Sequence, residues 1–161
     1  MENEDYKKFK LLFNGMAEGV ALHKYIYDEK GKVINYTIED VNASFEKILK
    51  VNKKDVVGKM ATEAYKTETA PYLENYLDIK EGEEKKFEIF FEPMQKFFSI
   101  SVSPWGEDGF ATIFFDITEN KLTEESLKEK NNHLEKIQKM IIDRELRMIE
   151  LKDEIEKIKK N

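Results

Sequence analysis

The 161-residue sequence contains no cysteine, three prolines, seven glycines and two histidines. Without cysteine it can form no disulfide, thiolate metal site or cysteinyl-flavin bond, and it has no cysteine nucleophile. No apolar run approaches the roughly 18 residues of a membrane span, and the opening "MENEDYKKFK" lacks the apolar core of a signal peptide. We therefore expect a cytoplasmic protein with no membrane partner, although a cytoplasmic segment of a larger membrane-bound protein would look the same.

The charge is acidic overall and unevenly distributed. The formal net charge is −6, which argues against a nucleic-acid partner. Residues 119–161 carry eleven acidic and eleven basic side chains, so the whole negative excess falls in residues 1–118. A charge-dense but balanced tail indicates a helix laced with ion pairs.

The spacing of apolar residues in the first half predicts a short helix, a hairpin and a second helix. The amphipathic N-terminal helix is expected within residues 1–17. Two strands follow, joined at residues 28–31, where Gly31 supplies the positive φ of a tight loop. A helix then begins after Asn42 or Ser44, either of which can cap it, and short turns and loops follow. The apolar positions of the first helix are Tyr6, Phe9, Leu12, Phe13 and Met16.

From Lys85 onward the sequence is strand-like three times. The first two segments alternate apolar with polar residues, whereas "GFATIFFDI" is apolar nearly throughout, as expected for a central strand covered on both faces. Two strands, a block of small helices and three more strands predict an α+β domain with a five-stranded antiparallel sheet over residues 18–118. The alternating residues are Phe87, Ile89 and Phe91, and then Phe98, Ile100 and Val102.

Residues 119–161 have the pattern of a coiled coil. Neither proline nor glycine occurs after Thr118, and apolar residues recur at heptad spacing over about five repeats. A single helix cannot bury such a seam, so we expect a homodimer, parallel if the helices lead to an effector at one end. The seam residues are Leu127, Leu134, Ile137, Ile141, Met148, Leu151, Ile155 and Ile158.

Residues 6–118 resemble a PAS domain, the sensory module of bacterial and archaeal signalling proteins. The matching segments are "LFNGMAEGVALH", "DEKGKVINYTIEDVNASFEKIL", "DVVGK", "FFSISVSPW" and, most specifically, "FFDIT". The tail, with "RELRMIELKDEI", resembles the linker between a PAS domain and a histidine kinase or diguanylate cyclase. The resemblance implies a PAS-like sheet with short helices on one face. It also implies a dimeric sensor or relay in two-component signal transduction, with an effector such as a histidine kinase core.

The sequence Asp116-Ile117-Thr118 joins the last strand to the long helix. Thr118 is expected to cap that helix, its hydroxyl accepting an unpaired amide of the first turn. Asp116 lies on the same side of the strand as Thr118, so the two would form one polar clasp if Asp116 bonds the sheet or a lysine. The resemblance implies that this joint relays strand rearrangements to the helix; the alternative is that it only caps the helix.

The resemblance also implies a ligand pocket between the sheet and the small helices. No histidine lies between Phe45 and Phe87, which argues against the haem-binding mode of the family, and covalent flavin would require a cysteine. We expect either no cofactor or a small apolar or amphipathic molecule, and no metal. His23 either faces the pocket or is a hydrogen-bonded structural histidine. The pocket candidates are His23, Phe45, Leu49, Phe87, Ile89 and Ile100.

The sequence shows no catalytic constellation, so we do not expect an enzyme. His133 could be a kinase phosphoacceptor, but "LEK" follows it in place of the acidic base expected directly after such a histidine, and an exposed helix position explains it equally. Two alternatives to the sensor remain open. One is a ligand-free dimerisation scaffold that docks a partner's helices, for which Ile142 and Ile149 widen the apolar stripe. The other is a small enzyme built on a similar α+β cup.

Overall fold

The computed structural model describes residues 3–77 and 79–159. The chain divides into two compact units, Met1–Thr118 and Glu119–Asn161. The first unit is an α+β domain, and the second continues the long helix that begins at Thr118.

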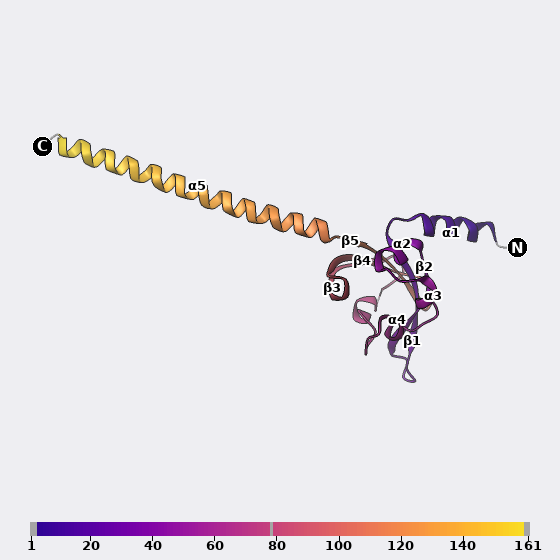
Figure 1. Ribbon diagram of the computed structural model, residues 1–161. Coiled ribbons are helices and arrows are strands. Elements are labelled where there is room, and N and C mark those ends of the chain that lie inside the picture. Colours follow the sequence, from indigo (N-terminus) through magenta and orange to yellow (C-terminus); the bar gives the residue numbers. More distant parts are fainter. Residues whose placement is uncertain (1–2, 78, 160–161) are drawn as a thin grey trace. The chain divides into compact units, whose positions relative to one another are not determined.

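Five antiparallel strands form one sheet in the order β2-β1-β5-β4-β3 (Figure 1). They are β1 (Gly19–Tyr27), β2 (Val33–Val41), β3 (Lys85–Phe91), β4 (Lys96–Pro104) and β5 (Gly109–Asp116). The first hairpin turns where expected: Gly31 has a φ of +77°, and the Asp28 carboxylate accepts the amide hydrogens of Lys30 and Lys32. The predicted α+β class and five-stranded antiparallel sheet are confirmed.

One face of the sheet carries the main hydrophobic core. Phe98, Ile100 and Val102 on β4 are buried in alternation with less buried serines, as the period of two requires. On β5, burial also alternates, and Phe115 on the outer face is 44% exposed. The expectation of a strand covered on both faces therefore fails at this end of β5.

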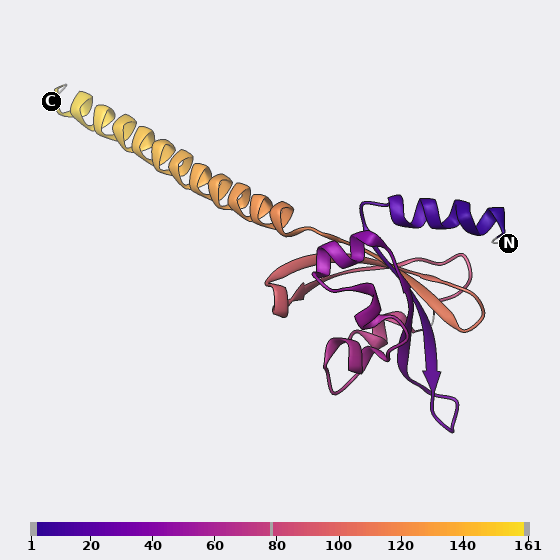
Figure 2. The same ribbon diagram turned by 45° about the vertical axis from the view of Figure 1, so that its right-hand side comes forward.

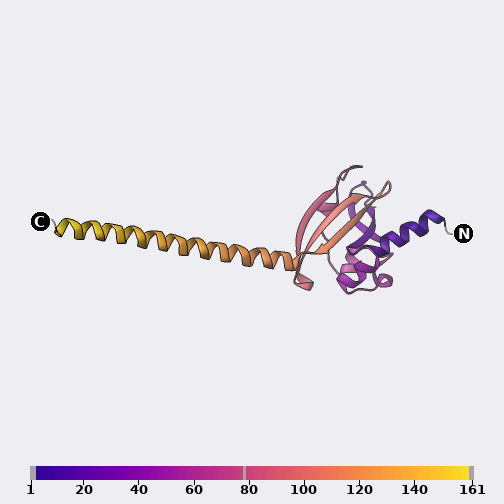
Figure 3. The same cartoon turned by 90° about the horizontal axis from the view of Figure 1, so that it is seen from above.

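Short helices cover the core face (Figure 3). They are α2 (Ala43–Leu49), α3 (Lys53–Val56), α4 (Ala61–Tyr65) and the 3₁₀ helix η1 (Leu73–Tyr76). A second 3₁₀ turn, η2 (Glu92–Met94), links β3 to β4. Tyr72, immediately before η1, adopts left-handed backbone with a φ of +56°, a conformation unusual for a bulky residue.

Helix α1 (Glu4–Gly15) packs on the opposite face of the sheet (Figure 2). Its Phe9 and Phe13 pack over a small cluster that contains Val20 and Leu22 of β1, the residues that alternate with the core-facing ones. Phe9 also stacks on Trp105, with ring centroids 5.7 Å apart. The amphipathic helix predicted from its apolar spacing is therefore part of the domain and covers one end of the outer face.

Helix α5 (Thr118–Lys159) runs without interruption for 42 residues. None of its residues is buried within the chain. At about 1.5 Å per residue it is roughly 60 Å long.

Candidate functional site

A cavity of about 430 Å³ lies on the core face of the sheet. Residues of β1, β2, β4 and β5 line it, together with α2, the segment from residue 65 to 76, and the end of β3 with η2. Its volume is within the usual range of small-molecule sites. Among its lining residues Thr67, Phe90, Glu92 and Pro93 are exposed, which places the opening of the cavity between the 65–76 segment and the end of β3 with η2.

Five of the six pocket candidates line this cavity: His23, Phe45, Leu49, Ile89 and Ile100. The sixth, Phe87, is not among the lining residues and instead packs near Tyr76, with ring centroids 6.1 Å apart. Phe87 lies nearer the β3 end that is farther from η2, so its side chain contributes to the core and not to the cavity wall.

Four tyrosines that line the cavity were not identified from the sequence: Tyr36, Tyr65, Tyr72 and Tyr76. Alternation along β2 could have placed Tyr36 inward, because it is two residues from the buried Ile38. The other three lie in a stretch of short helices and loops that has no hydrophobic period. No local signal could have assigned them to a pocket.

His23 is both structural and part of the cavity wall. Its ring is 3% exposed, and Nε2 lies 3.0 Å from the hydroxyl oxygen of Thr112, a second lining residue. The other ring nitrogen, Nδ1, is buried and has no hydrogen-bond partner among the described residues. Burial lowers the pKa of His23 to about 3, against a smaller opposing effect from the Thr37 backbone. The imidazole is therefore neutral at physiological pH.

The cavity tyrosines are neutral as well. Burial raises the pKa of Tyr36, Tyr65 and Tyr76 above the usual range of a phenol. Tyr36 donates its hydroxyl hydrogen to the carbonyl oxygen of Pro71, 3.1 Å away. The phenols are therefore present as hydrogen-bond donors and not as phenolates.

The junction of β5 and α5 is held by a polar clasp made of Asp116, Thr118 and two residues of β4. The Asp116 carboxylate accepts bonds from Lys96 Nζ at 2.6 Å, from the Thr118 amide at 2.9 Å and from the Thr118 hydroxyl at 2.5 Å. Burial alone would raise the pKa of Asp116, but the bonds from Lys96 and Thr118 lower it to about 2. Asp116 is therefore ionised across the physiological range.

Thr118 does not cap the helix in the way expected from the sequence. Its hydroxyl oxygen accepts the amide hydrogen of Phe97 on β4, at 3.0 Å, and not an amide of the first helical turn. The Phe97 carbonyl in turn accepts the Ile117 amide, at 2.9 Å. It is the Asp116 carboxylate that accepts the amide hydrogen of the first helical residue. Thr118 thus extends the β4–β5 pairing into the helix, because the Phe97 amide lies one residue beyond the last strand pair, Phe98 with Asp116.

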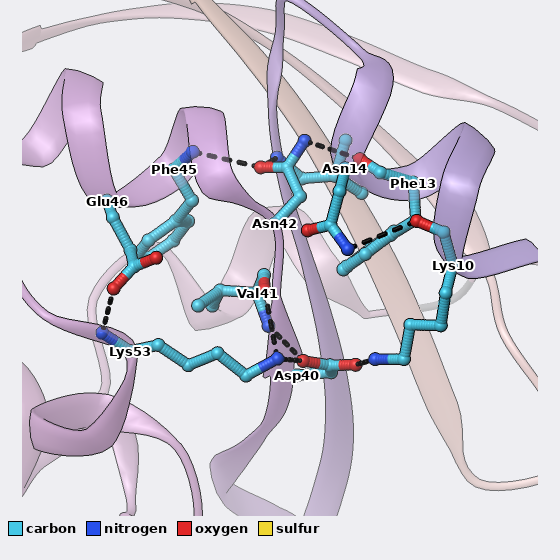
Figure 4. Close-up of polar contacts among 10 residues, drawn as sticks. Lys10, Phe13, Asn14, Asp40, Val41, Asn42, Phe45, Glu46 and Lys53 are labelled. Atoms are coloured by element: carbon cyan, nitrogen blue, oxygen red, sulfur yellow. Dashed lines mark hydrogen bonds and ion pairs between the residues drawn. The ribbon is translucent and has the colours of Figure 1, made fainter.

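A second polar cluster joins α1 to the edge of the sheet (Figure 4). Asp40 accepts bonds from two lysines, Lys10 of α1 and Lys53 of α3. Both can reach it because β2 is an edge strand, open toward α1 on one side and α3 on the other. Burial would raise the pKa of Asp40, but the two lysine bonds outweigh it and leave the pKa lowered.

Asn42, two residues further, has all four of its side-chain hydrogen-bonding positions filled, and Figure 4 shows the bonds to Phe45 and Phe13. Its Oδ1 accepts the amide hydrogens of Val20 and of Phe45, both at 2.9 Å. Its Nδ2 donates to the carbonyls of Phe13 at 3.0 Å and Glu18 at 2.9 Å. One side chain with no exposed surface thus ties together the end of α1, the approach to β1 and the start of α2.

The heptad residues of α5 all lie on its surface within the single chain. Leu127, Leu134, Ile141 and Met148 are each about half exposed, and Ile158 is 75% exposed. His133 is exposed too. An exposed apolar stripe of this length is a candidate surface for binding another helix, and it is the one functional feature that we assign to α5.

Residues 3–77 and 79–159 contain neither a candidate membrane span nor a candidate metal site. No helix there is long and apolar enough to cross a membrane. Across residues 3–77 and 79–159, no three histidine or acidic side chains are grouped so that they could hold a metal ion.

Comparison with known proteins identifies the fold. No protein-family model and no curated protein matches the chain. Among solved structures, the PAS domain of BvgS from Bordetella pertussis is similar, with a TM-score of 0.50 and 15% sequence identity. The match covers 81% of this chain and 98% of that one. At this identity the likeness bears on the fold alone, and it confirms the prediction of a PAS-like α+β architecture.

Proposed function

We propose that this chain is a cytoplasmic sensory module of the PAS type, which passes a ligand- or partner-induced change through the Asp116–Thr118 joint to a dimeric coiled coil. The observation that carries the proposal is that the same two strands serve both the cavity and the joint. Thr112 and Phe114 of β5 line the cavity, and Asp116 follows on the same face of that strand. On β4, Ile100 lines the cavity and Lys96 holds the joint.

A change in the cavity would reach α5 along a short path. A ligand that displaces Phe114 or Ile100 shifts β4 against β5, and the clasp bonds span this strand pair. Phe97 contributes both its amide and its carbonyl to the joint, so sliding of β4 strains two bonds at the first turn of α5. Paired helices have discrete alternative packings and can therefore convert a small shift into a switch.

The proposed partner is a second copy of the chain, joined in parallel through the heptad seam of α5. Burying the exposed seam of one α5 against another removes a long apolar stripe from water, which favours association. The output would be a signalling effector of the two-component type, such as a histidine kinase core. We propose no catalytic step for this chain.

The second candidate function is a ligand-free dimerisation scaffold. It is favoured by Ile142 and Ile149, which are each 56% exposed and lie beside the heptad seam. Such a widened stripe would accept helices of a partner without any signal from the domain.

The dimer is tested at the seam. We expect the unmodified chain to be a dimer at micromolar concentration, and Leu134→Asp to raise the dissociation constant by roughly 100-fold or more, because it places two carboxylates in an apolar interface. Asn132→Asp, which adds the same charge on the opposite side of the helix, is the matched control and should leave the dimer intact. Sedimentation equilibrium measures both. A monomeric unmodified chain would contradict the proposed dimer.

The relay is tested at the joint. We expect Asp116→Ala with Thr118→Ala to uncouple the domain from α5 with little loss of folding, because the clasp is at the surface. Coupling between two sites is reciprocal, so breaking the dimer with Leu134→Asp should change amide hydrogen exchange in β4 and β5 when the joint is intact. In the double variant that change should disappear.

Thr123→Val is the control for this experiment, since Thr123 is an exposed threonine of α5 outside the clasp. Two results count against the relay. Wholesale unfolding of the double variant would leave Asp116 and Thr118 with only a structural role, and an exchange response unaffected by their loss would show that the joint carries no signal.

A further inference from the structure

Only one of the described side chains that line the cavity is charged. The chain has 27 lysines and arginines, yet none of those within residues 3–77 and 79–159 lines the cavity. Glu92 is the one acidic side chain among the lining residues of this cavity, and it is exposed at the opening. The other ionisable groups of the lining are His23 and the four tyrosines. His23, Tyr36, Tyr65 and Tyr76 are neutral for the reasons given above, and burial raises the pKa of Tyr72 as well. Any charge on a ligand inside would therefore lack a counter-charge.

Aromatic rings make up the inner wall. His23 stacks on Phe110, which lies behind the wall and does not line the cavity, with ring centroids 4.6 Å apart, and its ring lies 5.0 Å from that of Tyr36 in an edge-to-face arrangement. Tyr36 and Tyr76 are also edge-to-face, at 5.5 Å. Such a wall offers both ring faces and ring edges, the two surfaces against which a planar aromatic molecule packs best.

Several polar groups of the cavity wall have no hydrogen-bond partner among the described residues. No described residue hydrogen-bonds the phenol hydroxyls of Tyr65, Tyr72 and Tyr76, whereas Tyr36 is paired with Pro71. These hydroxyls can donate to a ligand oxygen. His23 adds a buried Nδ1 without a partner among the described residues, an acceptor or donor according to its tautomer.

The size of the cavity sets the size of the ligand. An apolar cavity of about 150 Å³ is enough to bind benzene. At about 430 Å³ this cavity has room for a molecule of roughly two fused rings with a polar substituent.

We infer that the cavity binds an uncharged aromatic molecule bearing a hydroxyl or carbonyl oxygen, and discriminates against carboxylates and ammonium ions of the same shape. This inference rests on the proposed function in one respect only, namely that this cavity is the sensory site. A carboxylate would be desolvated with no cation to pair with it, and would approach past Glu92. An ammonium ion would lose its hydration among neutral rings. Glu92 could not pair with it there, because Glu92 lies at the opening of the cavity.

Three probes of one shape test the inference: 2-naphthol, 2-naphthoate and (2-naphthylmethyl)ammonium, titrated calorimetrically into the full chain at pH 7. We expect 2-naphthol to bind at least tenfold more tightly than either ion. Equal or tighter binding of an ion, or no binding of 2-naphthol, would overturn the inference. Saturation-transfer NMR on the same samples shows which protons of the probe contact the protein.

The tyrosine hydroxyls are tested separately. The triple variant Tyr65→Phe, Tyr72→Phe, Tyr76→Phe keeps every ring and removes three donors, so 2-naphthol should bind at least tenfold more weakly. Tyr27→Phe, at an exposed position of β1 outside the cavity, is the matched control and should bind as the unmodified chain does. If the folded triple variant binds 2-naphthol with unchanged affinity, the three hydroxyls play no part in recognising the ligand.

The outcome separates the ligand class from the sensory role. If 2-naphthol binds selectively but leaves hydrogen exchange in β4 and β5 unchanged, the ligand class stands and the sensory function fails. If no probe binds while the seam and joint experiments succeed, the ligand class fails and the relay stands.

Discussion

Asn42→Ala should lower the free energy of unfolding by about 4 kcal/mol, the largest effect expected of any single substitution proposed for this protein. The substitution removes the N-cap of α2, worth about 1 kcal/mol. It also leaves the Val20 amide and the carbonyls of Phe13 and Glu18 without the side chain that now pairs them. Because the site has no exposed surface, water cannot replace the lost bonds without a local opening.

Two variants make this result specific. Asn52→Ala is the matched control, because Asn52 also precedes a short helix but is exposed and makes no side-chain cap bond, so it should cost under about 0.5 kcal/mol. Asn42→Ser retains a cap oxygen while losing both donors, and should fall between alanine and the unmodified chain. Urea unfolding at one protein concentration measures all three. A loss of less than about 1 kcal/mol for Asn42→Ala would show that the four bonds are readily replaced.

The chain should also lose about 2 kcal/mol of stability as the pH falls from 7.5 to 5, and His23 should account for most of this loss. In the unfolded chain an imidazole has a pKa near 6.5, whereas burial holds the pKa of His23 in the folded state at about 3. Below pH 6.5 the unfolded state therefore binds a proton that the folded state does not. Stability is fully present above the unfolded pKa and decreases as the pH falls toward 3.

The two histidines of the chain provide the comparison. His23→Phe keeps a ring among Tyr36 and Phe110 and removes the titrating group, so its stability should change little between pH 7.5 and 5, whatever its absolute value. His133→Asn, an exposed substitution on α5, should retain the full decrease. An equal decrease in His23→Phe would assign the pH dependence to other groups. Urea unfolding at each pH supplies the free energies.

The elements themselves could be predicted because their patterns are local. The alternation of Phe98, Ile100 and Val102 identified a strand with one buried face, and Gly31 marked the hairpin turn that the structure contains. The seven-residue spacing from Leu134 to Ile141 predicted a helix, which is present, and a coiled coil, which remains a prediction. In each case the information lies within a few residues of the chain.

For the polar contacts, the sequence showed which side chains could form a cap but not which partner each one takes. Asn42 and Ser44 were equally good caps, and the fold assigns the cap to Asn42, while the Ser44 hydroxyl donates to the Met16 carbonyl, 2.7 Å away. Thr118 had the chemistry of an N-cap, but the amide of Phe97, 21 residues earlier, occupies its oxygen. Which partner a side chain takes depends on what the fold brings beside it.

The sequence by itself determined the order of the strands and helices along the chain, the more buried face of β3 and of β4, the heptad stripe of α5 and the absence of cysteine chemistry. Only the tertiary structure decided that Tyr36, Tyr72 and Tyr76 share a cavity with His23, and that Asn42 links three elements. The physical reason is the range of the interactions. Periodicity and turn preference act between near neighbours in the chain, whereas a cavity and its charge arise from residues far apart in sequence that packing places together.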